Sequence, residues 1–120
     1  MWEAPYLVTY GVATDKKANA TMERDVDESR QRMIDQQLKL RGITDCRVLD
    51  AMDRVPREEF VPLEHSDKAY DDCALPIAER QTISQPYTVA FMCQALHLKG
   101  TERVLEIGTG SGYGAAVLSL

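Results

Sequence analysis

Hydrophobic and polar positions divide the chain into a front part without regular spacing and a longer part with clear periodicity. Residues 1–26 show no sustained period, so we expect a loosely ordered extension there. From Asp27 onward, side chains of one face recur at helical spacing: Met33, Ile34, Gln37, Leu38 and Leu40. Lys39 and Arg41 close this stretch before Gly42, a pattern that predicts a helix with a glycine at its C-terminal end.

A second, shorter helix is predicted directly afterwards. Thr44 or Asp45 is placed to cap its first turn, and Pro56 ends it. Its apolar stripe is Val48, Leu49, Met52 and Val55. The chain then loses its periodicity up to Arg80, and we interpret Arg57–Glu59 within it as a solvated turn. Isolated apolar residues are expected to anchor this long loop: Phe60, Val61, Tyr70, Leu75 and Ile77.

The last part of the chain combines an extended segment, an apolar helix, a strand and the start of another helix. The segment 81–84 is short and extended, and Ser84 or Gln85 can cap a helix that Pro86 opens. That helix, which runs to Leu98, is apolar nearly all round, so we expect it to be mostly buried. The β-branched and apolar run 103–107 predicts a buried strand, and a further helix starts at Tyr113.

Composition narrows the function classes. The chain has 120 residues, a formal net charge of −5 and scattered rather than clustered Lys and Arg, which disfavours nucleic acid as a partner. It has no apolar run near the ~20 residues that span a membrane. Three cysteines without a C-x-x-C pair predict a reducing, cytoplasmic setting and no metal site. Among them Cys93 is expected to be buried in its helix, while Cys46, His65 and His97 carry no predicted role.

The run VLEIGTGSGY holds three glycines at alternate positions, Gly108, Gly110 and Gly112, directly after the predicted strand. Glycine is needed where a chain turns tightly and a ligand approaches its backbone. Tyr113 stands where a dinucleotide fingerprint needs its last glycine, and no Gly-Lys-Ser/Thr follows, so a pyrophosphate ligand is disfavoured. Glu106 and this turn suit a cationic ligand without phosphates, such as S-adenosylmethionine. The alternative is a tight turn whose glycines only pack helix against strand.

Several stretches together resemble the protein-L-isoaspartate (D-aspartate) O-methyltransferase family. They are QQLKLRGITDCRVLDAMDRVPREEFVP, AYDDCALPI, QTISQPYTVA and RVLEIGTGSGYGAAVLSL, in the family's order and spacing, over roughly residues 36–120. The combination of TISQP with VLEIGTGSGY is specific to the family. One departure is Ala78–Arg80, where the family commonly has a glycine-rich approach.

The resemblance implies the N-terminal part of a Rossmann-like, S-adenosylmethionine-dependent α/β fold with an incomplete sheet, because the family's domain continues beyond the position of Leu120. Residues 27–120 would form this portion, with a substrate-side region at 27–101 and the strand, glycine turn and helix at 102–120. The implied activity is protein repair, by methyl transfer to the α-carboxylate of L-isoaspartyl residues. Isoaspartyl proteins and peptides would be the partners, without nucleic acid or membrane, and the full-length form would be a monomer.

By the same resemblance, Ser84 is the expected catalytic residue, whose hydroxyl would orient the substrate carboxylate. That carboxylate, with a pKa of about 4, is already ionised at neutral pH and needs no general base. The residues expected to bind the cofactor are Gln81, Thr82, Ile83, Ser84, Glu106, Gly108, Thr109, Gly110, Ser111 and Gly112. For Tyr87 and Tyr113 we favour core packing or a hydroxyl anchor over a contact with the sulfonium. Two alternatives stay open: a non-catalytic, methyltransferase-like fragment, and a related small-molecule methyltransferase.

Overall fold

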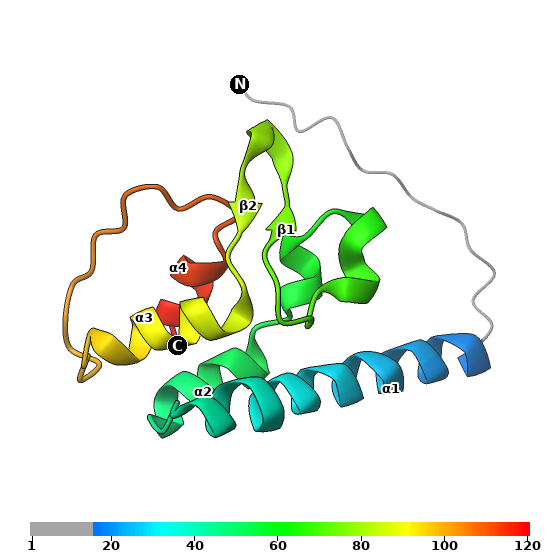
Figure 1. Cartoon of the computed structure of the whole chain (residues 1–120), viewed down its shortest axis with the longest axis horizontal. Helices are drawn as coiled ribbons and strands as arrows, with labels where there is room; N and C mark the ends of the chain where they lie inside the picture. Colours follow the sequence, from blue (N-terminus) through cyan, green and yellow to red (C-terminus); the bar gives the residue numbers. More distant parts are fainter. Residues whose placement is uncertain (1–15) are drawn as a thin grey trace.

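The structure, a computed structural model, describes residues 16–120. Helices and one small two-stranded antiparallel sheet make up the described part, and the hairpin of this sheet projects away from the longest helices (Figure 1). The elements in chain order are α1 (Lys16–Arg32), α2 (Cys46–Arg54), β1 (Leu75–Pro76), β2 (Thr82–Ile83), α3 (Pro86–Ala95) and α4 (Tyr113–Leu118). This arrangement is compatible with part of an α/β methyltransferase fold, although residues 16–120 contain no parallel sheet. No helix in this range is long and apolar enough to cross a membrane.

Helix α1 begins well before the expected start at Asp27. The first fifteen residues of the expected extension lie outside the described part, but the segment from Lys16 onward is helical. Residues 18–25 are exposed, so this part of α1 packs against little. Periodicity detects only helices that bury one face, whereas this stretch forms a helix from residues such as Ala, Met, Glu and Arg with good helix propensity.

The C-terminal end of α1 widens into a π-helical turn over Met33–Leu38, where the Lys39 N–H bonds to the Ile34 carbonyl. Met33, Ile34 and Leu38 are buried in the core. Gly42, with φ 89°, ends the segment in the left-handed conformation, which confirms the predicted glycine C-cap. The prediction for Leu40 is wrong: its side chain is 79% exposed, because the wider turn changes which face the following residues present.

Helix α2 forms as predicted, and Asp45 rather than Thr44 caps it: the Asp45 carboxylate accepts the Arg47 N–H at 3.0 Å. The Gln94 side chain of α3 holds the start of α2. Its Oε1 accepts the backbone N–H groups of Thr44 and Asp45 at 2.8 and 2.9 Å, and its Nε2 donates to the Gly42 carbonyl at 3.1 Å. This amide therefore joins two helices that the sequence separates by a long loop.

The loop after α2 contains short 3₁₀ turns and then forms a hairpin. Leu75 pairs with Ile83 and Pro76 with Thr82. As expected of the anchors, Tyr70 and Leu75 are buried and the others pack partly against the core. At the hairpin tip, Glu79 and Arg80 both have φ 57°, a left-handed conformation that favours glycine.

Helix α3 starts at Pro86, as predicted, with Gln85 at the N-cap and no side-chain cap. It ends at Ala95 rather than Leu98, because His97 adopts a left-handed φ of 50°. The expectation that the helix is mostly buried is only half right. Val89, Ala90 and Cys93 are buried, whereas Phe91, Met92 and Leu96 are about half exposed.

The predicted buried strand at 103–107 is wrong. These residues form no regular element, and the side chains of Leu105 and Ile107 are 85% and 90% exposed. The segment runs as an open loop between α3 and α4, drawn in orange in Figure 1. A parallel strand forms only against a neighbouring strand, and residues 16–120 supply none beside it. The helix expected from Tyr113 does form, as α4.

Candidate functional site

A cavity of about 510 Å³ brings the two sequence motifs together. Thr82, Ile83 and Ser84 line it from the hairpin side. On the other side lie residues of the segment before α4: Glu106, Gly108, Thr109, Gly110 and Ser111. The volume falls within the range of about 300–1,000 Å³ that is usual for small-molecule sites.

The glycine turn takes a conformation that only glycine adopts without strain. Gly108, Gly110 and Gly112 have φ values of 79°, 56° and 85°. A Cβ at any of the three would meet no atom within 4 Å, so their conformation rather than crowding requires glycine. The Thr109 hydroxyl donates to the Glu106 carboxylate at 2.8 Å, and the Gly112 N–H bonds to the Thr109 carbonyl at 2.9 Å. These bonds close the turn on itself.

Ser84 leaves the end of β2 with an exposed side chain. Its hydroxyl makes no hydrogen bond within residues 16–120, while its carbonyl accepts one from Arg57 at 2.8 Å. The Ser84 backbone is therefore fixed and its hydroxyl is free to meet a ligand.

Two predicted site residues lie outside the 510 Å³ cavity. Gln81 lines a neighbouring cavity of about 480 Å³ beside the hairpin tip, which shares Gly110 and Ser111 with the larger one. Gly112 lines neither cavity and instead forms the N-cap of α4. The structure thus brings eight of the ten predicted residues to one cavity.

The walls of the 510 Å³ cavity are apolar and carry little charge. Phe91 and Met92 of α3, together with Leu96 directly after it, form one wall, which explains why these side chains are not packed in the core. Among the residues that line the cavity, Glu106 alone is charged. Burial, and secondarily Glu106, raise the pKa of the Cys93 thiol, so this thiol stays protonated and is a poor nucleophile. The cavity therefore favours a ligand with an apolar body and a positive charge.

Sequence reasoning missed Arg57. The predicted solvated turn is wrong for this residue, whose side chain is fully buried. Burial lowers the pKa of its guanidinium, while Tyr113 acts in the opposite direction. Tyr113 itself is packed in the core, as favoured from the sequence, and burial raises its pKa to about 12. An arginine between a proline and two acidic residues gives no local signal of burial, because its partners lie far along the chain.

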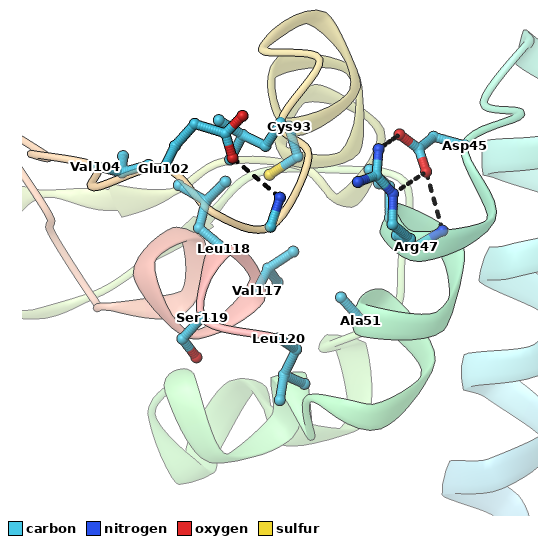
Figure 2. A pocket seen from close by; sticks show the side chains of 13 residues that line it. Asp45, Arg47, Ala51, Cys93, Glu102, Val104, Val117, Leu118, Ser119 and Leu120 are labelled. Atoms are coloured by element: carbon cyan, nitrogen blue, oxygen red, sulfur yellow. Dashed lines mark hydrogen bonds and ion pairs between the residues drawn. The ribbon is translucent and has the colours of Figure 1, made fainter.

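A third cavity, of about 380 Å³, lies between the start of α2, the loop after α3 and the end of α4 (Figure 2). Its charged groups already have partners. Asp45 pairs with Arg47 at 3.2 Å on one side, and on the opposite side the Glu102 carboxylate accepts N–H groups of Lys99, Gly100 and Thr101. It contains none of the predicted site residues, and we regard the 510 Å³ cavity as the candidate site.

Comparison with known proteins agrees with the motifs that meet in this cavity. The family model described as protein-L-isoaspartate(D-aspartate) O-methyltransferase matches residues 28–120. Protein-L-isoaspartate O-methyltransferase 2 of Anaeromyxobacter sp. (strain Fw109-5) is 56% identical over 110 residues, which are 91% of this chain and 45% of that protein. Protein-L-isoaspartate O-methyltransferase 2 of Marinobacter nauticus is 59% identical over 96 residues, 80% of this chain and 44% of that protein.

A third relative, protein-L-isoaspartate O-methyltransferase 1 of Rhodopseudomonas palustris (strain HaA2), is 61% identical over 90 residues, or 75% of this chain and 37% of that protein. The chain thus spans less than half the length of these curated relatives. The family model nevertheless covers most of the chain, including both motifs that line the cavity. The chain belongs to the protein-L-isoaspartate(D-aspartate) O-methyltransferase family.

Proposed function

We propose that the protein is a repair enzyme that transfers a methyl group from S-adenosylmethionine to the α-carboxylate of L-isoaspartyl residues in damaged proteins. The observation that carries this proposal is the shared cavity of the Thr82–Ser84 segment and the Gly108–Ser111 turn. Support also comes from the relatives, whose names describe protein-L-isoaspartate O-methyltransferases. The finer fold we propose is Rossmann-like, and the setting we propose is the cytoplasm.

The residues of the cavity fit the proposed cofactor. When bound, S-adenosylmethionine supplies a methyl group activated by a positively charged sulfur. Gly108 and Gly110 would let the cofactor approach their backbone, and Glu106 would accept hydrogen bonds from its ammonium or ribose groups. The apolar side chains of Phe91 and Met92 would cover its uncharged surface. The carboxylate of Glu106, the single charge of the lining, matches a cation better than a phosphate.

Ser84 would act on the substrate. Its hydroxyl, free within the described residues, would donate a hydrogen bond to one oxygen of the isoaspartyl α-carboxylate and direct the other oxygen toward the methyl group. No residue has to remove a proton, because the carboxylate, with a pKa of about 4, is ionised at neutral pH. Catalysis by this chain would then consist of positioning and exclusion of water. Gln81, beside the 480 Å³ cavity, would lie at the boundary between cofactor and substrate.

The test is methyl transfer to two peptides that differ only in an isoaspartyl or a normal aspartyl residue. Incubation of the chain with radiolabelled S-adenosylmethionine should give base-labile methyl ester on the isoaspartyl peptide and almost none on its isomer. Equal rates on the two isomers would favour the alternative of a related small-molecule methyltransferase, which would not distinguish the isoaspartyl carboxylate from the aspartyl one. Cofactor binding without transfer to either peptide would favour the non-catalytic alternative.

A further inference from the structure

The buried guanidinium of Arg57 contacts three distant segments. Its Nε donates to the Ala69 carbonyl at 2.6 Å and its Nη2 to the Ser84 carbonyl at 2.8 Å. Its central carbon lies 4.8 Å from the centroid of the Tyr113 ring. The backbone of Arg57 is held as well, since its N–H donates to the Tyr70 hydroxyl at 3.2 Å.

These contacts span the two sides of the candidate cavity. Ser84 ends the hairpin segment that lines one side, and Tyr113 follows Gly112 at the start of α4, directly after the glycine turn. Arg57 does not itself line this cavity. It therefore acts behind the site, on backbone and ring atoms that hold both motifs in place.

The chemistry of arginine suits this role. Its planar guanidinium offers five N–H donors in a fixed fork and can also stack on an aromatic ring, whereas lysine offers a single point charge. Within residues 16–120 Arg57 has no acidic partner: the neighbouring Glu58 carboxylate accepts the Tyr70 hydroxyl at 2.5 Å instead. A buried cation that is held only by carbonyls and a ring lowers the stability of the fold. If the position only had to be filled, an apolar side chain would be sufficient.

We propose that Arg57 is a positioning residue, which sets the placement of the Ser84 segment relative to the glycine turn. Its effect on cofactor binding rests on the function proposed above. The positioning itself can be measured without any ligand.

The experiment is backbone hydrogen–deuterium exchange, followed by mass spectrometry, on the whole chain and two variants. Arg57→Lys keeps the charge without the fork, and Arg57→Met keeps the length without the charge. We expect exchange about tenfold faster in two segments, 82–85 and 112–118, with α2 unchanged, because the first loses the hydrogen bond to the Ser84 carbonyl and the second loses the contact of the guanidinium with the Tyr113 ring. Arg54→Lys is the matched control, an exposed arginine near Arg57 that pairs with Asp50 at 3.3 Å, and it should change neither segment.

Three results would overturn the proposal: unchanged exchange in either segment, equally faster exchange in α2, or an Arg57→Lys variant that does not fold. The last two would make Arg57 a general core residue. If Arg57→Met alone fails to fold, Arg57→Lys decides.

Calorimetric titration with S-adenosylmethionine separates this proposal from the proposed function. We expect Arg57→Lys to weaken binding about tenfold, in line with the loss of the same two contacts. Equal affinity of the parent and Arg57→Lys would refute the positioning role and leave the proposed function standing. A parent chain that binds no cofactor would count against the proposed function, while the exchange experiment would still decide the role of Arg57.

Discussion

The Arg57 guanidinium lies 4.8 Å from the centre of the Tyr113 ring, and both side chains are buried. The Phe60 ring meets Tyr113 edge-on at a centroid distance of 5.5 Å, and the Tyr113 hydroxyl contacts the Met52 sulfur at 3.4 Å. The first residue of α4 is thus held by the turn after α2 and by α2 itself. These contacts of Tyr113, the residue that follows Gly112, pack the end of the glycine turn against the core.

Removal of the ring of Tyr113 should cost more stability than removal of its hydroxyl. We expect Tyr113→Phe to lower the free energy of unfolding by less than about 1 kcal/mol, because it loses only a weak bond to sulfur. Tyr113→Leu should lower it by about 2–3 kcal/mol, because the ring contacts with Arg57 and Phe60 are lost. Urea unfolding followed by circular dichroism measures both. Equal losses in the two variants would contradict a stabilising ring contact.

Tyr113 should also make the protein less stable in alkali. Burial raises the pKa of its hydroxyl to about 12, from the usual value near 10. The folded state therefore holds this proton more tightly, and its contribution is complete below about pH 10 and is lost as pH rises toward 12. Thermal unfolding from pH 8 to 11 should show a steeper decline for the parent than for Tyr113→Phe. Part of the decline should remain in the variant, because burial also raises the pKa of Tyr70.

Ser84→Ala should lower turnover of an isoaspartyl peptide by about 10- to 100-fold, because the carboxylate loses its orienting hydrogen bond. The affinity for S-adenosylmethionine should change little, since the Ser84 carbonyl and its bond to Arg57 remain. Steady-state kinetics and calorimetry measure the two quantities. Ser66→Ala is the control, since that hydroxyl bonds to the Leu63 carbonyl away from the site. A marked loss of cofactor affinity in Ser84→Ala would assign Ser84 to cofactor binding instead.

The glycine turn allows a matched comparison between strain and function. Gly110 lines the 510 Å³ cavity and has φ 56°, whereas Gly100 lies outside this cavity and has φ 93°. A Cβ on either glycine would meet no atom within 4 Å. Alanine at either position should therefore lower the free energy of unfolding by a similar amount, about 1–2 kcal/mol, through backbone strain. Only Gly110→Ala should weaken S-adenosylmethionine binding in a calorimetric titration. An equal loss of affinity in Gly100→Ala would mean that the effect comes from stability alone.

The hairpin tip should gain stability from glycine. Glu79 and Arg80 both hold a left-handed φ of 57°, which costs a residue with a Cβ about 1–2 kcal/mol. Part of that gain is offset by the greater freedom of glycine in the unfolded chain. We expect Glu79→Gly and Arg80→Gly each to raise the free energy of unfolding by up to about 1 kcal/mol. Ala78→Gly, at a position without positive φ, should lower it, and a gain of the same size there would contradict the strain argument.

Local sequence signals determined much of the secondary structure. The Asp45 cap, the Gly42 C-cap and the Pro86 start of α3 all form as the sequence predicts, because each depends on hydrogen bonds and backbone preferences within a few residues. The family, too, could be identified from two short motifs, and the comparison confirms it. The start of α1 was missed because an exposed polar helix has no apolar stripe to detect.

Only the tertiary structure decided that Arg57 is buried and which strands pair. The sequence predicts a strand at 103–107, but a strand needs hydrogen bonds from a neighbour, and residues 16–120 place none beside it. It predicts an exposed Arg57, but the Ala69 and Ser84 carbonyls and the Tyr113 ring enclose that side chain. In both cases the deciding partners lie far along the chain, and their positions follow from packing rather than from local pattern.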